Sequence, residues 1–189
     1  MSNALVTFLK LFRNIAGDEM EIASITQQRM YKEGELLLKE GSFAKELFFI
    51  VNGVLKITSV NDKGNDVTYF FVRENQFCTI LKSFNSGEPG GESIVAACDV
   101  EVLAIPKSKL LELYKKLPYM RELIEQVIQQ RLIDKIEIRN LYLGCDAATR
   151  YRLFIMREPD IALRVSLSDI ASYLGITPQS LSRIRKAIR

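Results

Sequence analysis

The chain has 189 residues, of which 48% are apolar and 26% are charged, and it contains no histidine. This length and composition allow a domain of ordinary size, with its own core, and a smaller second domain. The lack of histidine excludes Ser–His and Cys–His nucleophiles and removes the commonest imidazole metal ligand. Because no other residues form a nucleophile–base or metal-binding pattern, the sequence predicts neither an enzyme nor a metal site.

The net charge of +3 is unevenly distributed. Residues 1–149 hold 18 Lys/Arg and 20 Asp/Glu, a net of −2, whereas residues 150–189 hold 8 basic and 3 acidic residues, a net of +5. A basic terminal segment on a near-neutral body indicates a polyanionic partner for that segment. The alternative is a solvated basic tail.

Three well-separated cysteines (Cys78, Cys98 and Cys145) argue against a disulfide framework and for a reducing, cytoplasmic environment. They are too few for a four-cysteine iron–sulfur cluster, and we expect no cofactor. No apolar run reaches the roughly 18 residues of a membrane span, so no membrane association is expected. The opening "LVTFLKLF" is short and is interrupted by Lys10, so no signal peptide is predicted.

The first part of the chain combines short helices with many short strands. Residues 5–15 carry apolar side chains at helical spacing, and Asp18 is the expected N-cap of a second helix. From about residue 30 the sequence shows β-rich runs broken by Gly and Asn: "GELLLKEGS", "ELFFIVNGVLKITSV", "VTYFFVRENQF" and "SIVAACDVEVLAI". We therefore predict an α+β fold in which residues 5–116 form an antiparallel, jelly-roll-like β-roll with flanking helices.

Residues 117–142 contain the longest helical pattern in the chain. At 1.5 Å per residue, about 24 residues span about 36 Å, which exceeds what a small domain covers. We predict a dimerisation helix that pairs with its copy in a homodimer as a coiled coil, through Met120, Ile124, Val127, Ile128 and Leu132. The alternative is that the stripe packs only on its own sheet, since Arg131 and Asp134 interrupt a regular heptad.

Residues 146–189 are predicted to form a small helical domain. "LGCDAATR" is the expected hinge, with Asp146 as the N-cap of the next helix. In "VSLSDIASYLGITPQSLSRIRKAIR" two short helices meet at Gly175, which can adopt the left-handed conformation. Ser168 is the expected cap of the first helix. Thr177 is the expected cap of the second, with Pro178 at its first position.

The second of these helices carries a polar outer face suited to nucleic acid. Gln pairs with adenine, Arg with guanine, and Ser with a base or a phosphate. Arg185, Lys186 and Arg189 are placed to meet phosphates. The pattern predicts a helix-turn-helix that binds double-stranded DNA through Thr177, Gln179, Ser180, Arg183, Arg185 and Lys186. An ordinary αα corner is the alternative.

The chain resembles the bacterial CRP/FNR family of transcription regulators over nearly its whole length. The likeness lies in "YKEGELLLKEGSFAKELFFIVNGVLKI", with Gly34, Gly41 and Gly53 at turns, in the long helix at 118–142, and in "SLSDIASYLGITPQSLSRIRK". It implies a cyclic-nucleotide-binding-type β-roll that senses a signal, a homodimer, a two-fold-related DNA site read in part by Arg183, and RNA polymerase as a possible further partner. The family's usual β-hairpin wing is not evident after residue 189.

The resemblance also places an effector pocket at Phe77, Thr79, Ile80, Lys82, Glu92, Ser93, Asp134 and Lys135. In nucleotide-binding members a glutamate holds the ribose and an arginine pairs with the cyclic phosphate. Here Thr79 stands at the first position and Glu92 at the second, and Lys82 is the only nearby cation. Two like charges 4 Å apart repel by about 4 kcal/mol at an effective dielectric near 20.

The resemblance therefore implies a DNA-binding regulator that does not respond to cyclic AMP and whose effector, if it has one, is unknown. A competing hypothesis is a ligand-binding sensor or protein-interaction module with little DNA binding, prompted by the acidic loop and the missing wing.

Overall fold

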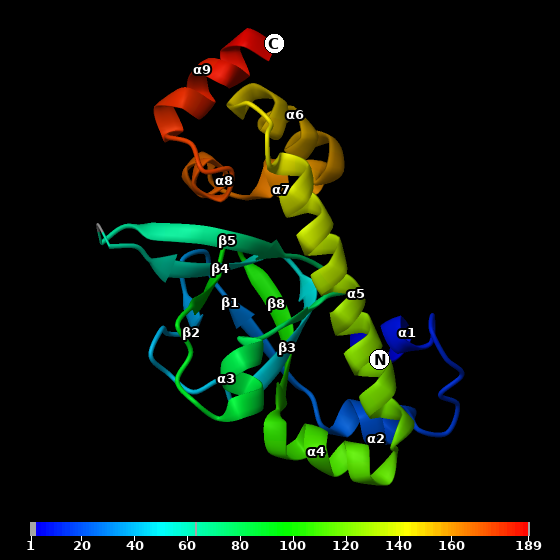
Figure 1. Ribbon diagram of the computed structural model, residues 1–189. Coiled ribbons are helices and arrows are strands. Elements are labelled where there is room, and N and C mark those ends of the chain that lie inside the picture. The colour runs from blue at the N-terminus through cyan, green and yellow to red at the C-terminus, as the bar shows by residue number, and fades with distance from the viewer. Residues whose placement is uncertain (1–2, 63, 189) are drawn as a thin grey trace.

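Two four-stranded antiparallel sheets form the first part of the chain (Figure 1). The computed structural model describes residues 3–62 and 64–188. One sheet has the order β1-β8-β3-β6 and the other β2-β7-β4-β5. The strands are β1 (Gln27–Tyr31), β2 (Leu36–Leu38), β3 (Glu46–Asn52), β4 (Leu55–Val60), β5 (Asp66–Val72), β6 (Phe77–Cys78), β7 (Ser93–Ala96) and β8 (Val100–Pro106). This arrangement confirms the predicted α+β fold with an antiparallel β-roll.

The apolar strands β3 and β8 form the centre of the first sheet. They pair antiparallel, with Phe48 opposite Ala104 and Phe49 opposite Leu103, and all four side chains are buried. Near-continuous apolar sequence is expected of strands that are covered on both faces. The turn from β3 to β4 is made at Gly53, whose φ of +97° lies in the left-handed region.

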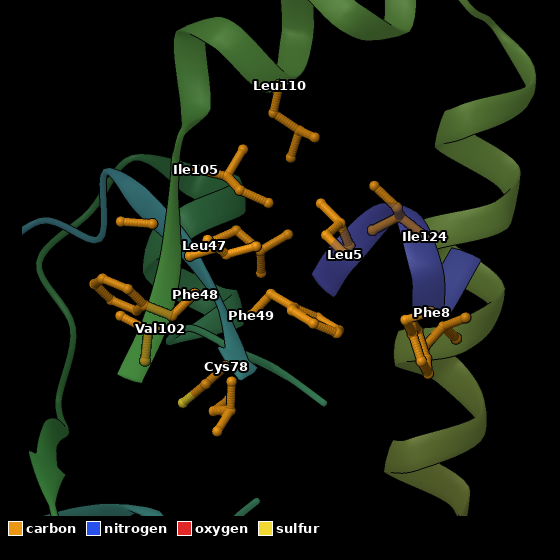
Figure 2. Packing of buried hydrophobic residues seen from close by; sticks show 14 of the residues in the cluster. Leu5, Phe8, Leu47, Phe48, Phe49, Cys78, Val102, Ile105, Leu110 and Ile124 are labelled. Carbon is orange, nitrogen blue, oxygen red and sulfur yellow. The ribbon is translucent and has the colours of Figure 1, made fainter. Parts of the chain in front are cut away.

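Four helices cover the first sheet: α1 (Ala4–Leu9), α2 (Glu19–Ser24), α4 (Lys107–Lys116) and the start of α5 (Tyr119–Tyr142). Figure 2 shows Leu5 and Phe8 of α1 on the side of Phe49 that faces α5, in the same cluster as Ile124. The Phe8 and Phe49 ring centroids are 5.2 Å apart. The apolar side chains of α1 thus fill the space between β3 and α5.

The N-terminal predictions need two corrections. The first helix does not extend to residue 15 but ends at Leu9, and Leu11 and Phe12 are exposed beyond it. Asp18 stands at the N-cap position of α2 but makes no capping bond. Its carboxylate instead accepts a hydrogen bond from the Tyr119 hydroxyl, which ties this loop to the start of α5. At Asp18 a tertiary contact thus outweighs the local capping signal.

Helix α5 has 24 residues, and its apolar stripe is divided between two environments. Met120, Ile124 and Val127 are at most 7% exposed, because they pack on α1, α4 and the first sheet of their own chain. These three side chains therefore have partners within their own chain, and their contact with a second subunit stays a prediction. Further along, Leu132 and Ile136 are 41% and 59% exposed. Ile128 is half-buried between the two stretches.

Helices α6 (Ala147–Arg157), α7 (Pro159–Arg164), α8 (Leu167–Tyr173) and α9 (Pro178–Ile188) form a C-terminal group above β4 and β5 (Figure 1). Their core continues into the β-roll, since Phe154 and Leu174 belong to the same buried cluster as Val54 and Phe71. The Phe71 and Tyr173 ring centroids are 5.2 Å apart. The C-terminal helices are thus packed on the second sheet of their own chain.

Candidate nucleic-acid interface and ligand cavity

Helices α8 and α9 meet at a tight turn built on Gly175. Its φ is +65°, and the Ile176 amide donates to the Ala171 carbonyl across the turn. Ala171 and Leu181 are completely buried, so the two helices approach closely on their inner sides. The left-handed turn and the small residue at the crossing agree with the helix-turn-helix pattern.

The caps of these helices follow the expected chemistry, with one shift. The Thr177 hydroxyl accepts a hydrogen bond from the Ser180 amide at 3.1 Å, and Pro178 is the first residue of α9. The N-cap of α8 is Ser166 and not Ser168, because the helix begins at Leu167. Ser166 has extended dihedral angles, and its hydroxyl accepts from the Asp169 amide at 3.1 Å. Asp146 caps α6 as expected, accepting from the Thr149 amide at 2.7 Å.

The polar residues of α9 lie on its outer side. Gln179, Arg183 and Lys186 are exposed, whereas Ser180 and Arg185 are half-buried. Spacings of four and three residues place the three exposed side chains on one face of the helix. The Thr177 and Ser180 hydroxyls are 3.0 Å apart and hydrogen-bonded to each other. Arg189 lies outside the described residues.

Two acidic residues of the C-terminal group pair with lysine or arginine of the β-roll. Asp169 pairs with Lys56 at 2.5 Å, and Glu158 pairs with Arg73 at 3.1 Å. Across residues 3–62 and 64–188, no ion pair involves Arg183, Arg185 or Lys186. The positive charge of α9 is therefore left uncompensated at the surface.

A cavity of about 270 Å³ lies between the β-roll and the middle of α5. Six of the eight predicted pocket residues line it: Phe77, Thr79, Ile80, Lys82, Glu92 and Lys135. Sequence reasoning missed the other lining residues, which are Leu47, Ile57, Tyr69, Phe70, Val72, Cys78, Leu81, Val127, Ile128, Arg131 and Leu132. Most of these are apolar strand or helix residues that sequence alone does not distinguish from ordinary core.

Ser93 and Asp134 are not among the lining residues. The Ser93 hydroxyl accepts from the Glu40 amide at 2.9 Å, which secures the loop before β3. Asp134 accepts from Arg131 at 3.2 Å and from Gln130 at 3.0 Å, both on its own helix. The Ser93 hydroxyl and the Asp134 carboxylate are thus hydrogen-bonded to groups of their own chain and do not line the cavity.

Thr79 has a structural partner of its own. The residue is 8% exposed, and its hydroxyl donates to the Glu46 carbonyl of β3 at 2.9 Å. That bond continues the contact between β3 and β6 beyond the last paired residue, Cys78. The hydroxyl proton is therefore already used, and Thr79 can offer a ligand only its acceptor capacity.

Helix α5 adds cations to the cavity that the loop does not supply. Lys82 is not the only one nearby, because Arg131 and Lys135 also line the wall. The Lys135 ammonium lies 4.6 Å from the centroid of the Phe70 ring. Burial lowers the pKa of Lys135, and burial raises the pKa of the neighbouring Cys78 thiol to about 12. Cys78 is therefore a protonated, buried thiol at neutral pH.

Across the described ranges 3–62 and 64–188, no helix is long and apolar enough to cross a membrane. The same residues contain no group of three or more His, Cys, Asp or Glu side chains placed to hold a metal ion.

Comparison with known proteins agrees with this architecture. The sequence model of the cyclic nucleotide-binding domain matches residues 28–116. The cyclic AMP receptor protein of Thermus thermophilus is 22% identical over 183 residues, which cover 94% of this chain and 84% of that protein. The transcriptional activator protein Anr of Pseudomonas protegens is 23% identical over 171 residues, covering 85% of this chain and 69% of that protein.

A solved structure shares the same overall fold. The c-di-GMP-responsive global regulator CLP of Xanthomonas campestris superimposes with a TM-score of 0.71 at 17% identity, covering 92% of this chain and 91% of that one. Because the superposition covers nearly the full length of both chains, the two proteins share the β-roll, the long helix and the C-terminal helices in the same arrangement. The chain thus contains a segment that matches the cyclic nucleotide-binding domain, and over nearly its full length it is similar to CRP/FNR transcription regulators.

Proposed function

We propose that the protein is a homodimeric transcription regulator that binds double-stranded DNA through α9 and does not respond to cyclic AMP. The observation that carries the proposal is the exposed face of α9, where Gln179, Arg183 and Lys186 lie together without acidic partners among the described residues. An amide and two cations on one helix face suit the major groove and its flanking phosphates. This surface favours a DNA-binding helix pair over an ordinary αα corner.

The dimer part of the proposal rests on the second half of α5. Leu132, Ile133 and Ile136 are between 41% and 59% exposed in the single chain. Three large aliphatic side chains within five residues of one helix are costly to leave in water. Pairing with the same stretch of a second chain would cover them and would bring two copies of α9 to one DNA site.

The cyclic AMP part rests on the charges of the cavity. Glu92 lies in the wall where a cyclic phosphate would need a cation, and among the described residues of the β-roll no arginine lines the cavity. Arg131 comes from α5 and is paired with Asp134 at 3.2 Å. Thr79 supplies no carboxylate for a ribose hydroxyl. Loss of a bidentate, charge-assisted contact together with repulsion from a carboxylate costs on the order of several kcal/mol.

DNA binding is tested with fragments from the region upstream of the protein's own gene, by gel shift and fluorescence anisotropy at about 50 mM salt. We expect the apparent affinity to fall as salt rises, because phosphate contacts release counterions. Arg183→Ala should cost about 1–3 kcal/mol and relax the preference at one base pair. Lys115→Ala removes the same charge from the exposed surface of α4 and should leave binding unchanged.

Two results would contradict the proposal: no binding to any fragment at low salt, or equal losses in the Arg183 and Lys115 variants. The cyclic AMP statement has a separate test, which is thermal unfolding with cyclic AMP added at millimolar concentration. A ligand that binds only the folded state raises the unfolding temperature. We expect no shift, and a large one would refute the roles given to Thr79 and Glu92.

A further inference from the structure

The cavity beside α5 has mainly apolar walls, with six polar or charged side chains among its 17 lining residues. Leu47, Ile57, Val72, Ile80 and Val127 all line it and are at most 9% exposed. They come from β3, β4, β5, the loop before α3, and α5, so the apolar surface surrounds the space. Ligand sites of this kind bind an apolar body and use a few polar groups to orient it.

The charged groups at the cavity sum to a net charge of about +1 once the Arg131–Asp134 pair is set aside. Arg131 is paired with Asp134, which leaves Lys82, Lys135 and the carboxylate of Glu92. Lys82 is exposed, whereas Lys135 and Glu92 are half-buried. Among the residues that the structure describes, no hydrogen bond or ion pair reaches the Lys135 ammonium. Its contact with the Phe70 ring leaves its three N–H donors unused.

A half-buried ammonium without an anion loses part of its hydration, and an anionic ligand would offset that loss. Burial lowers the pKa of Lys135, which agrees with reduced solvation of its charge. After Glu92 offsets one of the two remaining lysines, the site carries one uncompensated positive charge. The charge balance therefore favours a ligand with a single negative charge.

The volume limits the size of the ligand. At about 30 Å³ per water, about 270 Å³ corresponds to roughly nine waters, and so to roughly ten non-hydrogen atoms. Sites for drug-sized ligands run from about 300 to 1,000 Å³. This cavity suits a smaller molecule, with one polar end and an apolar remainder.

We propose that this cavity binds a small amphipathic monoanion, an aliphatic or aromatic monocarboxylate, with its carboxylate on Lys135 and its apolar body among Ile57, Val72 and Ile80. The inference deepens the proposed function, on which it rests, by assigning a chemical class to the effector. The ligand lies against Lys135, between the buried first half of α5 and its exposed second half.

The test is calorimetric titration of the full chain with matched probes. Octanoate and 4-ethylbenzoate carry the expected charge and body, octan-1-ol keeps the chain without the charge, octylamine reverses the charge, and butyrate shortens the chain. We expect measurable binding of octanoate or 4-ethylbenzoate, weaker binding of octan-1-ol and butyrate, and none of octylamine. Equal binding of octanoate, octan-1-ol and octylamine would overturn the proposal, as would the absence of binding by both carboxylates.

Two variants assign the binding to this cavity. Lys135→Met keeps the apolar stem and should weaken octanoate binding roughly tenfold to a hundredfold while leaving octan-1-ol unchanged. Glu92→Gln removes the competing carboxylate and should strengthen octanoate binding roughly fivefold. Lys115→Met, on the exposed surface of α4, is the matched control and should change nothing. Loss of octanoate binding in Lys115→Met equal to that in Lys135→Met would overturn the assignment.

Measuring DNA binding with the unmodified, ligand-free chain separates this inference from the proposed function. DNA binding without carboxylate binding refutes the ligand class alone. Carboxylate binding without DNA binding refutes the regulator and leaves the cavity assignment standing.

Discussion

Lys56 of β4 and Asp169 of α8 form an ion pair that joins the second sheet to the first helix of the helix-turn-helix. The two side chains are only 19% and 15% exposed, with Nζ and Oδ1 2.5 Å apart. Removing one partner of a largely buried pair leaves the other charge unpaired, which costs more than the loss of a surface pair. The contact is therefore expected to contribute to how firmly the C-terminal helices are held.

Lys56→Met should lower the free energy of unfolding by about 1–3 kcal/mol, measured by urea denaturation. Asp169→Asn should cost a similar amount, and the double variant should cost less than the sum, because the two side chains act as one pair. Lys109→Met is the control. Its ion pair with Glu112 is 57% and 58% exposed, so its loss should cost less than about 0.5 kcal/mol. Strictly additive losses would contradict the prediction.

A second link, between Glu74 and Arg164, should make stability depend on pH. Burial by itself raises the pKa of Glu74. Hydrogen bonds from Arg164 and from backbone amides, including that of Gly53, lower the pKa by a larger amount. The pKa of Glu74 is therefore below its usual value. The folded state then binds fewer protons than the unfolded state just below the unfolded pKa of about 4.3. The stabilisation is present above that pH and is lost as the pH falls through the folded pKa.

The measurement is urea denaturation between pH 6 and pH 3. Arg164→Met should lower stability at pH 6 and flatten its fall below about pH 4.3, since part of the cause of the depressed pKa is gone. Lys115→Met, which removes an equivalent charge from α4, should keep the original slope. Parallel curves for the Arg164 variant and the unchanged chain would rule out this contact as the source.

Ile136→Glu should dissociate the proposed dimer. Ile136 is 59% exposed in the single chain, so the variant should keep its fold, whereas two carboxylates at a paired seam would repel and lose water. We expect the dissociation constant to rise at least about a hundredfold in sedimentation equilibrium. Met20→Glu changes an 87% exposed residue on α2 and serves as the control. A dimer that persists equally in both variants would exclude this stretch of α5 from the interface.

Gly53→Ala should be strongly destabilising. A Cβ at this position would lie 2.4 Å from the Asp99 carbonyl oxygen, and the φ of +97° is unfavourable for any L side chain. Backbone strain and the clash together should lower the free energy of unfolding by about 2–4 kcal/mol. Gly64→Ala has a φ of +77° but no atom within 4 Å, so only the strain of about 1 kcal/mol should remain. Equal losses at the two glycines would contradict the role given to the clash.

Local chemistry made much of the fold predictable. Alternating and apolar strand patterns, the stripe of α5, and the Gly175, Thr177 and Pro178 signals are each set within a few residues, and the structure has them where the sequence indicates. The cap of α8 was misplaced because both Ser166 and Ser168 can cap, and the choice depends on where the helix begins. In the structure α8 begins at Leu167, directly after the buried Val165 and the cap Ser166.

The candidate cavity was harder to predict, because its chemistry comes from segments far apart in sequence. Thr79 and Glu92 were visible as departures from a family pattern, but the acceptor of the Thr79 hydroxyl, the Glu46 carbonyl, is set by strand register. Lys135 becomes the cation at the wall only because α5 crosses the β-roll at that point. The packing of Tyr173 on Phe71 likewise has no local signal.

The position of Ser172 has a consequence for self-association. Strand β5 is the last strand of its sheet, and its outward Thr68 amide donates to the Ser172 hydroxyl at 2.9 Å. An open strand border of this kind can template the addition of foreign chains, and natural proteins guard against it by covering the border. Any rearrangement that lifts α8 from β5 would bare that border together with Phe71. A state in which α8 has left β5 would then be prone to aggregation through this edge strand. How long the protein stays in that state would matter as much as its activity.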